Sequence, residues 1–225
     1  MRMARKKVPV RKSINDESQP HIKDRLVEIA ARHFAEHGLQ GASQRAIQRD
    51  AGVNISTTNY YFGSKKALYR AVIEAALSRI QQRRISGLEC IPTDLSINQR
   101  LRALLDAYLG SHIREAASES GYNYLRIVAS LNLAATDATV KIIEDLVNPV
   151  RELYVNEFAK MFPGASRNRV YHVLWLSTSL MSMAPMQLRR TSISNRVIER
   201  IVADVVTIAA SAFETLCRSE DDLDY

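Results

Sequence analysis

Cysteine, histidine and glycine are scarce in this chain of 225 residues, which has two cysteines, five histidines and eight glycines. Cys90 and Cys217 lie far apart in the sequence, and neither stands near a histidine cluster. The pattern suggests neither a disulfide framework nor a zinc site, and we expect a protein of a reducing cytoplasm. No Gly-rich phosphate loop, G-x-S-x-G motif or H-E-x-x-H motif occurs. We therefore expect neither an enzyme nor a bound cofactor.

Two of the histidines, His33 and His37, are four residues apart. This spacing could hold a metal ion from one face of a helix. No third ligand is evident, and a histidine near the end of a helix also interacts favourably with the helix dipole. We expect no metal site.

Long apolar runs are also missing. The most apolar window, from Val173 to Met186, is too short and too rich in serine to span a bilayer, so we interpret it as a buried helix. The basic start MRMARKKVPVRKS is followed by the polar stretch INDESQPHIKD in place of the apolar core of a signal peptide. We expect neither a membrane span nor export.

Positive charge is abundant and unevenly distributed. The net charge is +7, and residues 1–84 hold 17 Lys and Arg against 7 Asp and Glu, whereas residues 85–225 hold 14 against 17. A basic segment of this kind indicates a polyanionic partner, with nucleic acid first and an anionic membrane surface second. A surface that is basic only for solubility is the alternative.

The spacing of apolar residues predicts an all-α protein, with strand-like alternation scarce. Residues 1–20 form a predicted flexible basic arm, which either lies along DNA or only aids solubility. Residues 21–70 form a small helical domain, joined through a helix over 64–84 to a larger helical domain over 85–218. An acidic tail follows at 219–225. The loop from Arg84 to Ser96 marks the predicted domain boundary.

Within residues 21–70, helix signals alternate with glycine breaks. Apolar positions from Ile22 to Phe34 predict a first helix that stops at Gly38, and Ser43 begins a second helix that Gly52 ends. Further on, Asn54 and Ser64 are predicted N-caps for a third and a fourth helix, with Gly63 between them. Two short helices joined by a tight turn, after a supporting helix, predict a helix-turn-helix unit.

The stretch AGVNISTTNYYFGSKKAL, residues 51–68, has the chemistry of a DNA-reading helix. Short polar side chains can bond base edges in the major groove, and Asn can bond adenine through two hydrogen bonds. Hydroxyl groups, ammonium groups and a helix N-terminus can hold phosphates on either side. A solvated surface helix is the alternative. The candidate DNA contacts are Gln44, Arg45, Asn54, Ile55, Ser56, Thr57, Thr58, Asn59, Tyr60, Tyr61, Ser64, Lys65 and Lys66.

Residues 22–70 resemble the N-terminal domain of the tetracycline-repressor (TetR) family of bacterial transcription factors. The matching motifs are FAEHG, GASQRAI, AGVN and YYFGSKKAL in this order. The resemblance implies that Arg45 and the third-helix residues Ile55, Ser56, Thr57 and Asn59 face the major groove, and that Tyr61 and Lys65 hold phosphates. The sequence departs from the family pattern at Thr58 and Asn59, so base preferences do not transfer. It also departs at Gln48, which bears on how closely the second and third helices approach.

Large aromatic and sulfur-containing side chains interrupt the apolar stripes of residues 85–218. They pack in a core, or they line a pliable pocket for an apolar small molecule, which the resemblance favours. The candidate pocket residues are Tyr108, His112, Tyr122, Tyr154, Trp175, Met181 and Met183.

The last two predicted helices are apolar on more than one face and contain small residues such as Ser177 and Ala209. A homodimer through these helices would bury the excess apolar surface and place two reading helices about one DNA turn apart. Packing within one chain is the alternative. The sequence thus predicts a dimeric DNA-binding regulator, most simply a repressor released from its operator by an apolar effector. The other candidates are a non-specific architectural DNA-binding protein and a small-molecule-binding protein or enzyme without DNA coupling.

Overall fold

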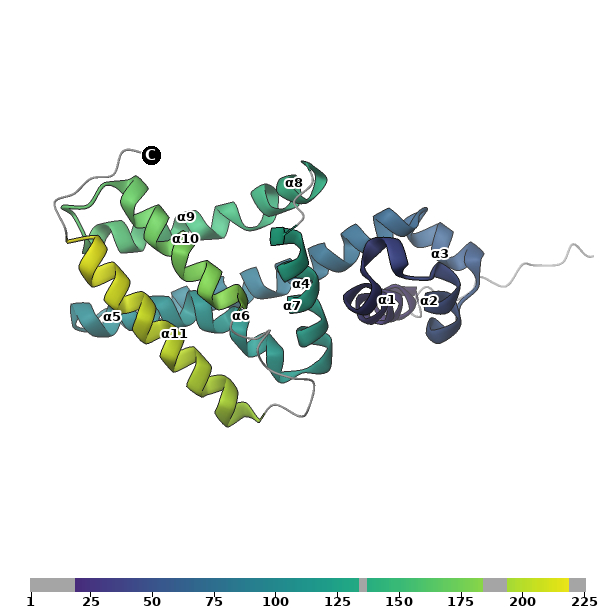
Figure 1. Ribbon diagram of the computed structural model, residues 1–225, viewed down its shortest axis with the longest axis horizontal. Helices are drawn as coiled ribbons and strands as arrows, with labels where there is room; N and C mark the ends of the chain where they lie inside the picture. Colours follow the sequence, from purple (N-terminus) through teal and green to yellow (C-terminus); the bar gives the residue numbers. More distant parts are fainter. Residues whose placement is uncertain (1–18, 134–136, 184–193, 219–225) are drawn as a thin grey trace, which may run out of the picture.

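The computed structural model describes residues 19–133, 137–183 and 194–218, and every regular element in these ranges is helical (Figure 1). This confirms the predicted all-α fold. The elements are α1 (Gln19–Gly41), α2 (Gln44–Ala51), α3 (Ile55–Phe62), α4 (Lys65–Glu89), α5 (Ile97–Leu105), the π-helical turn η2 (Asp106–Gly110), α6 (Ser111–Ile113), the 3-10 turn η3 (Arg114–Ala117), α7 (Glu119–Leu133), α8 (Asp137–Leu146), α9 (Asn148–Met161), α10 (Arg167–Met183) and α11 (Asn195–Leu216).

Two predicted segments fall largely outside these ranges: the basic arm, of which only residues 19–20 are described, and the acidic tail. Within the described ranges, no helix combines the length and the apolar character needed to cross a bilayer.

The predicted stop of the first helix at Gly38 is a kink, since Gly38 has φ of 65° and α1 continues to Gly41, whereas α2, α3 and α4 begin after the predicted caps. Side-chain oxygens of Ser43, Asn54 and Ser64 accept hydrogen bonds from the backbone N–H three residues further on, at 3.3, 2.8 and 3.1 Å. Gly52 and Gly63 end α2 and α3 with φ of 62° and 70°. Glycine reaches this region without a Cβ clash, so the predicted caps and these two breaks are confirmed.

The core of the N-terminal domain extends into the C-terminal domain. Leu26, Phe34, Ile47 and Leu68 from the first four helices are fully or almost fully buried in it. Side chains of α7 and α8 complete the same cluster: Tyr124, Ile127 and Ile142. The two domains therefore share apolar contacts.

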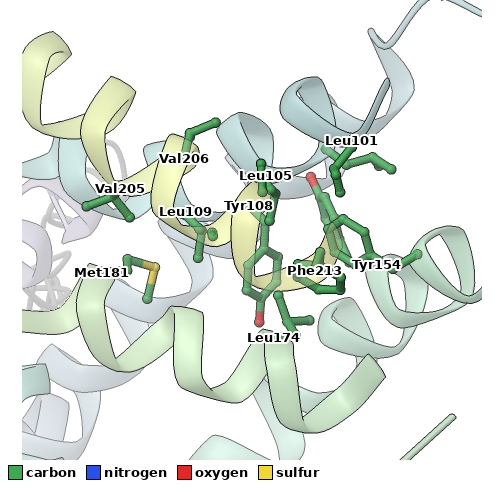
Figure 2. Close-up of a cluster of buried hydrophobic side chains, with 14 of the residues drawn as sticks. Leu101, Leu105, Tyr108, Leu109, Tyr154, Leu174, Met181, Val205, Val206 and Phe213 are labelled. Carbon is green, nitrogen blue, oxygen red and sulfur yellow. The ribbon is translucent and has the colours of Figure 1, made fainter. Parts of the chain in front are cut away.

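A second apolar core fills the C-terminal domain between η2, α9, α10 and α11. Figure 2 shows Tyr108, Tyr154 and Phe213 close together in it, with Leu174 and Met181 extending from α10. The rings of Tyr108 and Tyr154 lie 4.8 Å apart between centroids. Burial of such large rings makes this cluster a major source of folding stability.

Helix α4 connects the two domains and is longer than predicted. It runs through Glu89, so only the later part of the predicted 84–96 boundary loop is non-helical. Leu88 packs against the C-terminal core, and a Cβ at Gly87 would lie 3.1 Å from the Ala107 Cβ. Gly87 therefore serves close helix packing, and it does not end the helix.

Pro149 stands at the start of α9. It lies in the first turn of α9, and α8 ends separately at Leu146. Proline is well tolerated in a first turn because the N–H groups there have no helical partner.

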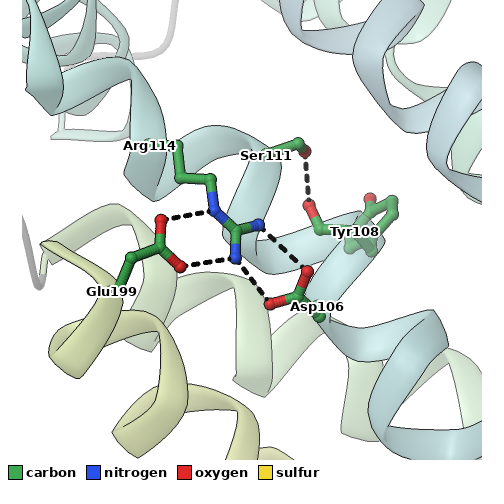
Figure 3. Close-up of polar contacts among 5 residues, drawn as sticks. All are labelled: Asp106, Tyr108, Ser111, Arg114 and Glu199. Atoms are coloured by element: carbon green, nitrogen blue, oxygen red, sulfur yellow. Dashed lines mark hydrogen bonds and ion pairs between the residues drawn. The ribbon is translucent and has the colours of Figure 1, made fainter. Parts of the chain in front are cut away.

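A partly exposed ion-pair network joins η2 to α11 (Figure 3). The Arg114 guanidinium donates to the Glu199 carboxylate at 2.8 Å through Nε and Nη2. It also donates to the Asp106 carboxylate at 3.0 Å through Nη1 and 2.9 Å through Nη2. One arginine thus joins residues far apart in the sequence.

Candidate functional site

Helix α3 presents a polar, solvent-facing side. Its exposed residues are Ile55, Ser56, Asn59 and Tyr60, with Thr57 half-buried. Ile55 and Ser56 lie four residues before Asn59 and Tyr60, so the exposed residues lie on one side of the helix. This face can enter a major groove without disturbing the core.

Thr58 corrects the sequence prediction. Its side chain is only 1% exposed, and its hydroxyl donates to the Asn54 carbonyl at 3.4 Å. A side chain buried under α3 cannot reach a base edge. Thr58 therefore anchors the helix.

Asn54 and Asn59 have different hydrogen-bonding capacity. Asn54 Oδ1 accepts from the Thr57 N–H at 2.8 Å and from the Thr57 hydroxyl at 3.0 Å. These bonds occupy both lone pairs of the oxygen. Asn54 is thus committed to capping, whereas Asn59 is exposed and can offer both ends of its amide to an adenine.

The flanks of α3 carry most of the predicted phosphate contacts. Tyr60 is 76% exposed, and its ring packs edge-on against Tyr61 at 5.2 Å between centroids. Arg45, Ser64 and Lys66 are exposed, and Gln44 is half-buried, so all four can be approached by a duplex.

Lys65 has a structural role that the sequence did not predict. Its ammonium group donates to the carbonyls of Gln40 at 3.2 Å and Ala42 at 3.0 Å. These bonds tie the start of α4 to the end of α1. An ammonium group has three protons, so a phosphate contact would use the third.

The histidine pair of α1 is used within the protein. His33 Nε2 lies 2.9 Å from Asp50 Oδ2, which links α1 to α2. This hydrogen bond is the main reason that the pKa of Asp50 lies below its usual value. Among the described residues, no group of three or more potential ligands could hold a metal ion.

An inner cavity of about 100 Å³ lies beside α4 in the C-terminal domain. It contains three of the predicted pocket residues, namely Tyr108, His112 and Met181. Helix α4 contributes Leu77, Ile80, Gln81 and Arg84 to the wall. A ligand here would touch the helix that leads to the DNA-binding domain.

A larger groove of about 500 Å³ adjoins this cavity, since Ile143, Arg151, Thr178 and Ser182 line both. Trp175 and Met183, two further predicted pocket residues, line this groove. Tyr122 and Tyr154 are not among the lining residues: Tyr122 packs against the core, and the Tyr154 hydroxyl donates to the Arg84 carbonyl at 2.7 Å.

The inner cavity has a positive electrostatic character. Burial, together with the charge of Arg84, lowers the pKa of His112 to about 3. His112 is therefore neutral at pH 7, and the charge in the cavity comes from the arginines.

Sequence reasoning missed Gln81, Arg84 and Arg151 as cavity residues. Gln81 and Arg84 follow Leu77 and Ile80 on the apolar stripe of α4, at i+4 and i+7 from Leu77. Polar residues on a buried stripe were the available signal. Arg151 comes from α9 and is brought there only by the tertiary fold.

Two family models match this chain. Residues 26–72 match the bacterial regulatory proteins of the TetR family, and residues 106–211 match the tetracyclin repressor-like C-terminal domain. A curated relative is the HTH-type transcriptional regulator BetI of Vibrio parahaemolyticus, 30% identical over 84 residues. These residues are 37% of this chain and 42% of that protein, so the chain matches less than half of its length.

Solved structures share the fold over almost the whole chain. A TetR-family regulator from Streptomyces coelicolor has a TM-score of 0.60 at 15% identity, covering 91% of this chain and 100% of that one. A bacterial regulatory protein of the TetR family from Rhodococcus RHA1 has a TM-score of 0.62 at 16% identity, covering 85% and 96%. The chain belongs to the TetR family of DNA-binding bacterial transcription regulators.

Proposed function

We propose that this protein is a homodimeric repressor that reads a specific operator through α3 and leaves it when a small molecule with an apolar part binds beside α4. The observation that carries the proposal is the exposed polar face of α3, which is held by capped helices in a strongly basic third of the chain. It would act in the bacterial cytoplasm, where the chromosome lies.

Exposed apolar side chains support dimerisation through α10 and α11. Leu176 and Leu180 on α10 and Val197 and Ile208 on α11 are between 39% and 54% exposed, although all are large and apolar. Such a patch on a soluble chain marks an interaction surface. A two-fold dimer would cover it and present two α3 helices to successive major grooves.

Ser56 and Asn59 would specify bases, while Tyr60, Ser64 and Lys66 would hold phosphates. Contacts to bases discriminate between DNA sequences, and contacts to phosphates add salt-dependent affinity. Thr58 and Asn54 would keep α3 in place.

Helix α4 provides a route from ligand to DNA. One part of it packs in the N-terminal core through Leu68 and Val72, and a later part lines the inner cavity through Gln81 and Arg84. A ligand that fits only one position of α4 would favour one separation of the two α3 helices. The ligand can change the affinity for DNA by no more than the ratio of its own affinities for the two forms of the protein.

The test is fluorescence anisotropy of the full-length protein with duplexes from the DNA upstream of its own gene. At physiological salt, the specific duplex should bind at least about 10³-fold more tightly than a shuffled duplex of equal composition. Equal affinities with a steep salt dependence would instead identify a non-specific architectural protein. A reporter gene behind the same DNA should be expressed more strongly in cells without the protein if it is a repressor.

A further inference from the structure

The inner cavity gathers hydrogen-bond donors deep inside the protein. Arg84 is 3% exposed and Gln81 is 6% exposed, and both side chains line the cavity. Gln81 Nε2 is buried and has no hydrogen-bond partner. Arg151, from α9, adds a second guanidinium to the same wall.

These two arginines lack the carboxylate partners that other arginines in the protein have. Arg114 binds Asp106 and Glu199, and Arg79 and Arg83 both bind the buried Glu115. Across the described ranges, no carboxylate lies within ion-pair distance of Arg84 or Arg151, and acidic side chains are absent from the residues that line the cavity.

The partners of Arg84 are weak or neutral. Its Nε donates to the Tyr108 carbonyl at 2.9 Å, which leaves Nη1 with Gln81 Oε1 at 3.4 Å and Nη2 with the Met181 sulfur at 3.5 Å. Its guanidinium also lies 3.8 Å from the centre of the Tyr108 ring. A thioether is a poor acceptor, so the two terminal nitrogens would gain by binding an oxygen anion.

Arg151 is half-buried and, like Arg84, contacts neutral groups. It donates to the Tyr171 hydroxyl, and its guanidinium lies 5.4 Å from the centre of the Tyr171 ring. A guanidinium stays charged at neutral pH, and a buried charge without a counter-ion is costly. Burial lowers the pKa of Arg84, and the charge of Arg151 adds to this effect.

We propose that the inner cavity binds the carboxylate of an amphipathic organic acid, with Arg84 and Arg151 as counter-ions and Gln81 Nε2 as a further donor. The apolar part of the acid lies in the adjoining groove against Trp175 and Met183. This inference rests on the proposed function, because it names the chemical class of the effector. A planar carboxylate suits the paired terminal nitrogens of an arginine.

Calorimetric titration of the full-length protein with matched pairs of compounds tests this site. The acids are butyrate, hexanoate, octanoate and benzoate, and each is compared with its neutral amide. At least one acid should bind about tenfold or more tightly than its amide, as expected for a charge-assisted hydrogen bond. Fluorescence of Trp175, the only tryptophan in the chain, should change on binding.

Arg84→Met and Arg151→Met should each remove the preference for the acid, because each removes one counter-ion and keeps the apolar stem. Arg102→Met is the matched control: Arg102 is exposed on α5 and donates to Thr207 at 3.2 Å, so the preference should persist. If Arg84→Met does not fold, Arg151→Met gives the answer alone, since Arg151 is only partly buried.

The site assignment is overturned if every amide binds as tightly as its acid, or if both variants keep the preference. Inorganic phosphate is the second anion tested, and binding of phosphate as tight as that of the best acid would overturn the carboxylate class. DNA binding is measured separately. An acid that binds through Arg84 and leaves affinity for the upstream duplex unchanged would support the site and contradict effector control of DNA binding.

Discussion

At the scale of single residues, the two asparagines of the reading segment have separate tasks. Asn54 caps α3 through two hydrogen bonds to Thr57, whereas Asn59 faces solvent on the same helix. The same side-chain type thus contributes to folding at one position and is available for recognition at the other. Substitutions at the two sites should affect different measurements.

We expect Asn54→Ala to lower the free energy of unfolding by about 1 kcal/mol, because it removes an N-cap. Asn54→Asp should retain most of the stability. Asn59→Ala, at an exposed position, should change stability by less than about 0.5 kcal/mol. Urea unfolding followed by circular dichroism measures all three, and an equal loss for Asn54→Ala and Asn59→Ala would contradict the capping role.

Thr58 allows a second comparison on the same helix. Thr58→Val keeps the shape of the side chain and removes only a long hydrogen bond of 3.4 Å. DNA sequence preference should therefore be unchanged, as measured by anisotropy with the upstream duplex and its single-base variants. A changed preference at any base pair would show that Thr58 reaches the DNA.

At the scale of helices, hydrogen bonds and ion pairs between side chains hold neighbouring elements in place. The Arg114 network joins η2 to α11, and the π-helical turn of η2 presents the Tyr108 carbonyl to Arg84 and to the Ser111 hydroxyl at 3.0 Å. An irregular turn inside a helix often marks a functional site. Here it lies beside the proposed carboxylate site.

The ion pair of Glu199 should make stability depend on pH in a predictable direction. Its hydrogen bonds from Arg114 hold the pKa of Glu199 below the ordinary value of 4.5. The stabilisation is complete above the unfolded-state pKa and is lost as the pH falls through the lower folded-state pKa. Wild type should thus exceed Arg114→Gln in unfolding free energy at pH 7, and this gap should shrink below about pH 4.5. A gap that is constant with pH would contradict the role of the pair.

At the scale of the whole molecule, the exposed apolar faces of α10 and α11 predict the assembly. Leu180→Glu places a charge within the proposed dimer surface and should give a monomer in analytical ultracentrifugation, with weaker operator binding. Ile97→Glu is the control, because Ile97 is 62% exposed and belongs to α5, outside the two helices of the proposed surface. A Leu180→Glu protein that remains dimeric would locate the interface elsewhere.

The parts of the fold that depend on local sequence were predictable. Caps at Ser43, Asn54 and Ser64 and the break at Gly52 follow from short-range hydrogen bonding and backbone sterics. The length of α4 was not predictable, because Gly87 serves tertiary packing against Ala107.

The candidate sites also combine features that local sequence predicts with features that depend on the tertiary fold. The reading helix lies in one continuous stretch, yet burial of Thr58 depends on how α3 packs on its neighbours. The cavity combines Gln81 and Arg84 from α4 with Arg151 from α9. Only the folded chain brings these residues together, so the sequence did not show which polar groups line the cavity.

Selection of binding sites from a pool of random DNA duplexes decides whether α3 reads sequence. The wild-type protein should select a two-fold symmetric sequence with half-sites about one helical turn apart. Asn59→Ala should change the selected bases within each half-site, and Thr58→Val should select the same sequence as wild type. A pool that stays random after repeated rounds, or one that is identical for Asn59→Ala and wild type, would contradict recognition by this helix.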